Sequence, residues 1–296
     1  ELKIKKKNNN HIKTKSSTTS GRGESDIDYV RPAELPAQDL YHGHSFITKW
    51  IFCQDAKVIG IQYTLTAVFT GVVGLILSWM MRMQLGFPDL FPFLTAESYY
   101  QMVTMHGMIM VVYLLTALFL GGFGNYLIPL MVGARDMVFP YANMISYWMF
   151  FVAVVVLMAS FFVPGGPTGS GWTLYPPQAI LEGTPGSGYG ILLMLISLSL
   201  FVIGFTMGGL NYVITILQAR TRGMSLLRMP LTIWGLFTAT VLALLAFPAL
   251  LVSSIMMTLD KVLGTSVCMP TIIQDGEAIY YDGCSCMPGC YTDLQL

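Results

Sequence analysis

Long apolar stretches and short polar breaks alternate along most of this 296-residue chain. A helix needs about 20 apolar residues to cross a hydrocarbon core of about 30 Å. Five stretches are long enough, and each predicts one spanning helix: 58–81, 99–132, 144–163, 191–217 and 229–259. The breaks between them hold the glycine, proline and charged residues that are typical of loops. The pattern therefore predicts an all-α fold, a polytopic transmembrane helix bundle.

Composition and charge agree with a membrane protein and predict its orientation. Charged residues make up 11% of the chain, against about 25% in soluble domains. Lysine and arginine concentrate before the first span and in the loops "GARD" and "ARTRGMSLLR", whereas the alternate loops carry none. Cations favour the inner side, so the N-terminus is expected inside. Residues 1–44 form a polar, basic stretch without the apolar segment of a secretory signal, which predicts a flexible extension or, alternatively, a transit peptide.

One histidine, His106, lies inside the second apolar stretch. On a helix it shares a face with Tyr99, Met102, Met110 and Tyr113, and an ionisable group in a span normally faces protein rather than lipid. The residues alone leave three roles open for it. These roles are a neutral imidazole bonded to a neighbouring helix, a metal or haem ligand, and a proton relay.

Three longer segments resemble subunit I of the haem-copper oxidases, the cytochrome c oxidase family. They are "MVTMHGMIMVVYLLTALFLGGFGNYLIPLMVGARDMVFPYANMISYW", "GSGWTLYPP" and "RMPLTIWGLFTATVLALLAFPAL", and the similarity runs from Ser45 to Met269. It covers helices one to five of a twelve-helix subunit. The resemblance implies the N-terminal part of a catalytic subunit that passes electrons to oxygen and translocates protons.

The resemblance also implies a haem-binding role for four residues. His106 corresponds to an axial ligand of the low-spin haem, expected to be haem a, and Gly107 would let the flat macrocycle approach. Arg82 corresponds to an arginine that contacts a haem substituent, and Trp172 and Tyr175 correspond to aromatic residues near the propionates. The alternatives are an arginine that reaches the membrane interface and an interfacial aromatic belt.

A proton path is implied in the same way. Asp136 corresponds to the carboxylate at the inner mouth of a proton channel, and Asn125 and Asn143 correspond to the asparagines above it. Without the resemblance, Asp136 next to Arg135 predicts an ordinary loop ion pair. The family's serine region on helix four matches poorly, because glycine and phenylalanine occupy it in "FVIGFTMGG".

The same comparison predicts which partners the chain needs. The other histidines, His11, His42 and His44, precede the first span. The second haem ligand, the high-spin haem and copper are therefore expected on a partner chain that carries the remaining helices, and this chain alone is not expected to be active. Further expected partners are other oxidase subunits, including one that binds the electron donor, cytochrome c or quinol, and the lipid bilayer, but no nucleic acid.

The expected location is the mitochondrial inner membrane or the bacterial plasma membrane. The alternatives are a fragment of a quinol oxidase subunit I and a haem-free structural or transport subunit. Beyond the transmembrane part (45–269), the outer-side tail (270–296) contains Cys284, Cys286 and Cys290. This tail indicates half of a split subunit with disulfides, a truncated or frame-shifted chain, or a metal-binding tail.

Overall fold

The computed structural model describes residues 50–88, 90–92, 94–176, 178–179, 183–265, 271–274 and 277–280. The predicted basic extension and the three tail cysteines lie outside the described residues. Five helices in the described part are long and apolar enough to cross a membrane, at Ala56–Gly86, Ala96–Val132, Pro140–Phe162, Tyr189–Gln218 and Leu231–Leu263. The predicted all-helical transmembrane bundle is thus confirmed, and the chain is an integral membrane protein.

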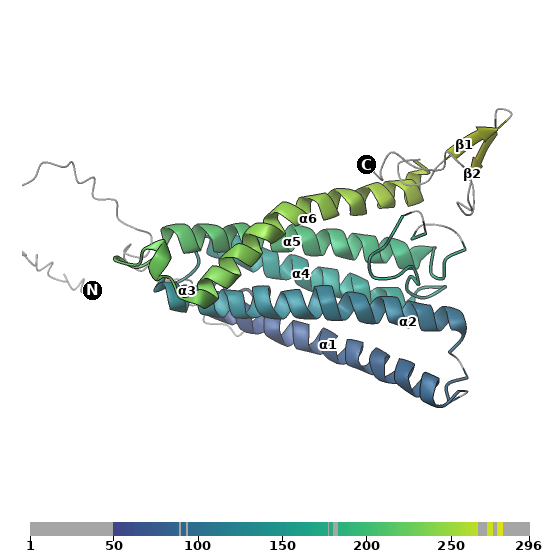
Figure 1. Cartoon of the computed structure of the whole chain (residues 1–296), viewed down its shortest axis with the longest axis horizontal. Coiled ribbons are helices and arrows are strands. Elements are labelled where there is room, and N and C mark those ends of the chain that lie inside the picture. The colour runs from purple at the N-terminus through teal and green to yellow at the C-terminus, as the bar shows by residue number, and fades with distance from the viewer. Residues whose placement is uncertain are drawn as a thin grey trace, which may run out of the picture. The chain divides into compact units, whose positions relative to one another are not determined.

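The spans run side by side for most of their length (Figure 1). In chain order the described elements are α1 (Ala56–Gly86), α2 (Ala96–Met108), η2 (Ile109–Gly124), α3 (Asn125–Val132), α4 (Pro140–Ala159), η3 (Ser160–Phe162), α5 (Tyr189–Gln218), η4 (Leu226–Arg228), α6 (Leu231–Leu263), β1 (Thr271–Gln274) and β2 (Glu277–Tyr280). The largest helix contacts join α4 to α5, α5 to α6, and α1 to η2. β1 and β2 pair as an antiparallel hairpin, which the sequence pattern did not predict.

The second span is one continuous helix with a change of winding. It begins as α2, continues as the π-helix η2 and ends as α3. In a π-helix the hydrogen bonds join residues i and i+5, so each turn contains more residues than a turn of α-helix. The predicted common face therefore separates: His106 and Met110 stay half-buried, whereas Tyr113 is fully buried.

Local chemistry fixes where several helices begin and end. The Asp55 carboxylate caps α1 by accepting from the Lys57 N–H at 2.9 Å, and Thr95 caps α2 through the Ser98 N–H at 3.3 Å. The second span ends at Gly133, whose φ of 76° is a left-handed conformation that suits glycine. The first two spans thus begin at residues that cap them, and the second ends before a glycine in a left-handed conformation.

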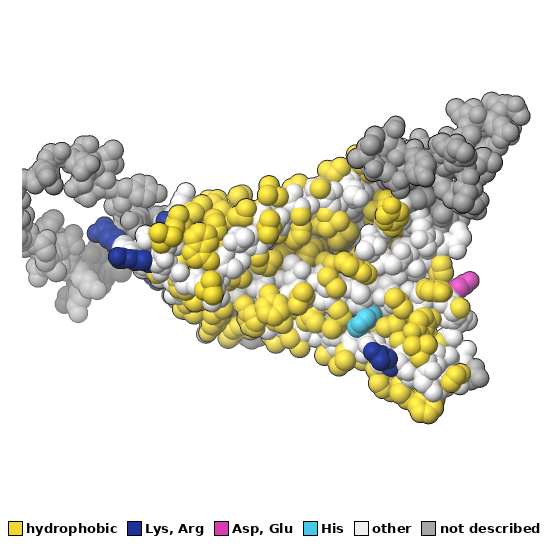
Figure 2. Space-filling view, viewed as in Figure 1, with side chains coloured by type: hydrophobic (Ala, Val, Ile, Leu, Met, Phe, Trp, Pro, Cys, Tyr) yellow, Lys and Arg dark blue, Asp and Glu magenta, His cyan; other side chains and the backbone are white. Residues whose placement is uncertain are grey.

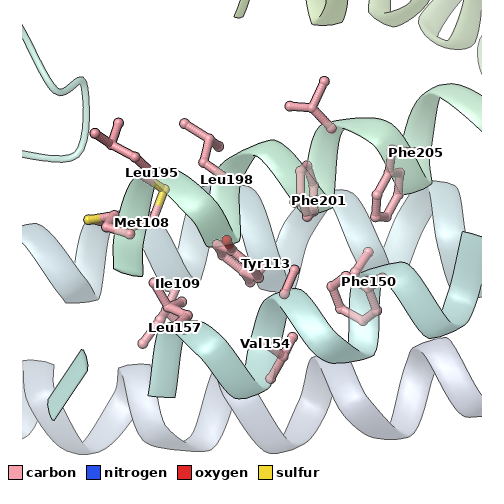
Figure 3. Close-up of a cluster of buried hydrophobic side chains, with 14 of the residues drawn as sticks. Met108, Ile109, Tyr113, Phe150, Val154, Leu157, Leu195, Leu198, Phe201 and Phe205 are labelled. Carbon is pink, nitrogen blue, oxygen red and sulfur yellow. The ribbon is translucent and has the colours of Figure 1, made fainter. Parts of the chain in front are cut away.

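Aromatic side chains form the centre of the bundle. Tyr113 of η2, Phe150 of α4, and Phe201 and Phe205 of α5 converge there (Figure 3). The rings of Phe201 and Phe205 stack with centroids 4.4 Å apart. Outside this core, hydrophobic side chains cover most of the viewed surface, and basic side chains lie at one end and also beside the histidine toward the other end (Figure 2).

Candidate functional site

His106 lies near the end of α2 and is oriented by the backbone of α1. Its Nδ1 is 2.8 Å from the carbonyl oxygen of Gly74. A Cβ added at Gly74 would lie 2.9 Å from the sulfur of Met110, so the methionine side chain would have to shift. The missing side chain thus allows η2 to approach the α1 backbone closely.

This contact determines which imidazole nitrogen carries the proton. A carbonyl oxygen can only accept, so His106 Nδ1 must be the donor, and Nε2 of the neutral ring keeps its lone pair. No residue in the described ranges is a hydrogen-bond partner of Nε2, and the side chain is half-buried. Figure 2 shows a histidine (cyan) at the surface of the apolar body. A fixed Nδ1–H and a free Nε2 are the arrangement of a haem or metal ligand, so these residues fit a haem iron.

Trp172 packs against α2 directly beside His106. A Cβ added to Gly107 would lie 3.2 Å from the Cβ and Cδ1 of Trp172. The loop is attached to the same helix by the Gly171 N–H, which donates to the Thr104 hydroxyl at 2.9 Å. Gly107 is therefore packed against the Trp172 side chain in this structure, and the lack of a side chain at Gly107 allows this close approach.

The turn that presents Trp172 contains a strained residue. Leu174 has a φ of 51°, which is rare outside glycine, and its side chain is buried. Its N–H donates to the Gly171 carbonyl at 3.2 Å. Burial of an apolar side chain thus holds a left-handed residue beside the site.

Arg82 and Tyr175 lie at the same end of the bundle as Trp172 but are exposed. Arg82 is eight residues beyond Gly74 on α1, about 12 Å along the helix axis. The Tyr175 side chain is 60% exposed and that of Trp172 is 47% exposed. The structure thus brings Trp172 next to His106 through its contact with Gly107, whereas Arg82 makes no hydrogen bond to His106 among the described residues.

Asp136 occupies the loop between α3 and α4, at the opposite end. Its Oδ1 accepts from the Met137 N–H at 2.7 Å and from the Ala56 N–H, at the start of α1, at 3.1 Å. Oδ2 is buried without a partner among the described residues. Burial raises the pKa of Asp136 from 3.8 to about 6, against the lowering effect of the two backbone N–H groups. The described part shows no ion pair between Asp136 and Arg135, so no neighbouring cation offsets the effect of burial through such a pair.

Asn125 and Asn143 are both fully buried and bond to each other. Asn143 Nδ2 donates to Asn125 Oδ1 at 2.7 Å, and Asn125 Nδ2 donates to the hydroxyl of Tyr212 at 2.6 Å. The Ser146 hydroxyl donates to the Asn143 carbonyl and lies 3.1 Å from the hydroxyl of Tyr63. The sequence analysis missed Tyr63, Ser146 and Tyr212, although polar groups within apolar spans are a signal that could have found them.

The helix-four region that matches the family poorly is filled with aromatic rings. Phe205 lies where serine is expected, stacked on Phe201 and 5.8 Å from the ring of Phe150. A Cβ at Gly204 would meet the Ser146 carbonyl at 3.0 Å. These two positions are therefore closely packed in this chain, with an aromatic ring at Phe205 and a helix contact at Gly204.

Comparison with known proteins identifies the family. Residues 58–283 match the family described as cytochrome c and quinol oxidase polypeptide I. The chain is 67% identical over 263 residues to the alternative cytochrome c oxidase subunit 1 of Bradyrhizobium diazoefficiens, covering 87% of this chain and 44% of that protein. It is 36% identical to a probable cytochrome c oxidase subunit 1-beta of Nocardia farcinica, covering 85% of this chain and 42% of that protein. A quinol oxidase subunit 1 of Bacillus subtilis is 38% identical, with 73% of this chain and 33% of that protein covered.

The chain spans less than half the length of these curated relatives. The matched part is the N-terminal part, and proteins of this family use haem and copper and work in complexes with other subunits. The chain therefore belongs to the haem-copper oxidase subunit I family and corresponds to the N-terminal portion of that subunit.

Proposed function

We propose that this chain forms the N-terminal part of the catalytic subunit of a cytochrome c oxidase and that His106 binds the iron of its low-spin haem, haem a. The observation that carries the proposal is the 2.8 Å contact between Nδ1 and the Gly74 carbonyl. That contact presents Nε2 as the ligand atom. When bound, the haem would relay single electrons by alternating between ferrous and ferric iron.

The other candidate residues would bind substituents at the edge of the haem. Trp172 lies against Gly107, so its indole N–H is available near the ligand to bond an anionic propionate. Arg82 and Tyr175 are exposed at the same end, where a guanidinium and a phenol can also bond propionate or ring substituents. The family's copper and high-spin haem are left to the part of the relatives' length that this chain does not match.

We favour cytochrome c over quinol as the electron donor. The identity to the alternative cytochrome c oxidase subunit 1 is 67%, whereas that to the quinol oxidase subunit 1 is 38%. The relatives come from prokaryotes, which supports a plasma-membrane location. The loops with arginine meet at one end, where the Thr221 N–H donates to the Val132 carbonyl, and this end is assigned to the cytoplasm.

Asp136 would be the proton-collecting group at that cytoplasmic end. Its carboxyl is partly buried and has a pKa near 6, so it can both take up and release a proton at cytoplasmic pH. Asn125 and Asn143, which are neutral, lie in the adjoining helices and would order water without trapping charge.

The experiment is a reduced-minus-oxidised spectrum of the assembled complex. His106→Ala should abolish the low-spin haem signal, while the complex still assembles. Met102→Leu, a volume-conserving change on the same face of α2, should retain it. An unaltered low-spin spectrum in His106→Ala would show that another residue binds this iron and would refute the proposal.

A further inference from the structure

The connection between α5 and α6, residues 219–230, has a defined structure. It contains the single turn η4, in which the Arg228 N–H donates to the Ser225 carbonyl at 3.0 Å. The indole N–H of Trp234, in the first turn of α6, donates to the Leu226 carbonyl at 3.0 Å. The start of α6 therefore holds this turn in place, and the side chains on the turn have a fixed direction.

Two leucines of this region project from the bundle. Leu227 is 93% exposed, and Leu231, the first residue of α6, is 87% exposed. Leu227 lies outside the spans, because α5 ends at Gln218 and α6 begins at Leu231. The ends of two spans place both leucines at the level of the membrane surface. An apolar side chain gains free energy when it leaves water, so these leucines favour an apolar environment.

Cations accompany the two leucines. Arg222 and Arg228 are both exposed in the same connection, and residues 219–230 include no acidic residue. The loop between α3 and α4, which a main-chain hydrogen bond joins to this connection, adds the exposed Arg135. Figure 2 shows basic side chains at this end of the bundle. The surface thus combines protruding aliphatic groups with positive charge, and it complements a partner that is apolar and anionic.

A negatively charged phospholipid has both properties. Its acyl chains can surround leucine side chains, and its phosphate can accept bidentate hydrogen bonds from a guanidinium. Leucines flanked by arginines are typical of segments that lie in the membrane interface, with the apolar side chains directed inward. Leucine is under-represented among the residues that dominate protein–protein binding. The surface therefore fits a lipid better than it fits another subunit.

We propose that the connection between α5 and α6 binds an anionic phospholipid of the adjoining membrane leaflet. Arg222 and Arg228 bind the phosphate, and Leu227 and Leu231 lie among the acyl chains. Among the five described spans α6 is the least buried against the others, so a lipid bound at its start limits its movement. The site goes beyond the proposed function and does not depend on it, because it needs neither a haem nor a proton path.

The test is photo-cross-linking of the assembled complex in nanodiscs with equal amounts of phosphatidylglycerol and phosphatidylcholine. In one preparation phosphatidylglycerol carries a diazirine in its acyl chain near the glycerol, and in the other phosphatidylcholine carries it. Peptide mapping by mass spectrometry measures adducts on Leu227 and Leu231. Adducts on exposed residues within the spans, such as Leu65 and Leu245, are the internal reference. Relative to this reference, phosphatidylglycerol should label the two leucines several-fold more than phosphatidylcholine does.

Variants assign the recognition to the arginines. Arg228→Gln should lower labelling by phosphatidylglycerol about fivefold, since one cation near an anionic membrane surface contributes about this factor in affinity. Arg228→Lys keeps the charge and should retain most of the labelling. Lys261→Gln is the matched control, because it removes the same charge from the last turn of α6, at the other end of the helix, and should leave the labelling unchanged.

Two results would overturn the proposal. Equal labelling of the leucines by both lipids would show contact with the bilayer without recognition of charge. Labelling of the spans without any adduct on Leu227 or Leu231 would show that water or another subunit covers the connection. His106→Ala should keep the wild-type labelling pattern even where it changes the haem spectrum, so this experiment fails or succeeds separately from the haem assignment.

Discussion

Replacement of Asp136 by asparagine tests whether burial controls this carboxyl group. Asparagine keeps the shape and the Oδ1 acceptor for the Ala56 and Met137 N–H groups but cannot ionise. In the folded chain the pKa is raised from 3.8 to about 6. The folded state therefore binds more protons than the unfolded state between about pH 4 and pH 6, and stability increases as the pH falls through this range.

The size of the effect follows from the shift. A pKa rise from 3.8 to about 6 corresponds to about 3 kcal/mol of penalty for the ionised carboxylate above pH 6. Asp136→Asn should therefore be more stable than wild type at pH 7.5, by up to about 3 kcal/mol. The advantage should disappear below about pH 4, where the wild-type carboxyl is neutral in both states.

Thermal unfolding of the purified complex across this pH range measures the difference. An infrared carboxyl band that titrates near pH 6 and is missing from Asp136→Asn would identify the group directly. Asp55→Asn serves as the control, because asparagine still caps α1 and the exposed aspartate has only a secondary effect on Asp136. A titration midpoint near pH 4, or a variant less stable than wild type at neutral pH, would refute control by burial.

Two glycine substitutions test the packing around the sites. Gly74→Ala places a Cβ 2.9 Å from a methionine sulfur of η2, so we expect a stability loss of about 1–3 kcal/mol in thermal unfolding and a shifted low-spin haem band as the His106 bond lengthens. Gly186→Ala places a Cβ 2.1 Å from the Pro167 carbonyl oxygen, at a residue whose φ is 73°. Gly165 has a similar φ of 85° but open space around it, so Gly186→Ala should lower the unfolding temperature more than Gly165→Ala. Equal losses in the two variants would show that the backbone angle alone sets the cost.

The spans were predictable because apolar length and helix formation are local properties. The first span runs past residue 81 to Gly86, since the residues between them include no helix breaker before the glycine. The π-helical winding of η2 was not predictable, because i to i+5 bonding has no apolar repeat of its own in the sequence. The separation of Tyr113 from the His106 face follows from that winding.

The resemblance to the family predicted which residues form the candidate site, but it did not predict the contacts that these residues make. Gly107 illustrates the difference: a glycine beside a ligand suggests space for a cofactor, but in this structure Trp172, from a loop more than 60 positions away, packs against it. Tyr212 illustrates it again, because a tyrosine in an apolar span shows its role only when Asn125 is found at 2.6 Å. Both depend on long-range packing, which no local pattern contains.

Both titratable groups of the candidate sites are oriented by main-chain atoms of α1. The carbonyl of Gly74 fixes the proton of His106, and the N–H of Ala56 holds the carboxylate of Asp136. These main-chain atoms lie 18 residues apart in one helix, about 27 Å along its axis, so a single rigid element sets the geometry at both ends of the bundle. Truncating the side chains of α1 keeps its main-chain atoms and so leaves both contacts in place. Adding a side chain at the contact between α1 and η2, as in Gly74→Ala, is therefore the more direct probe of how the helix supports the proposed electron and proton sites.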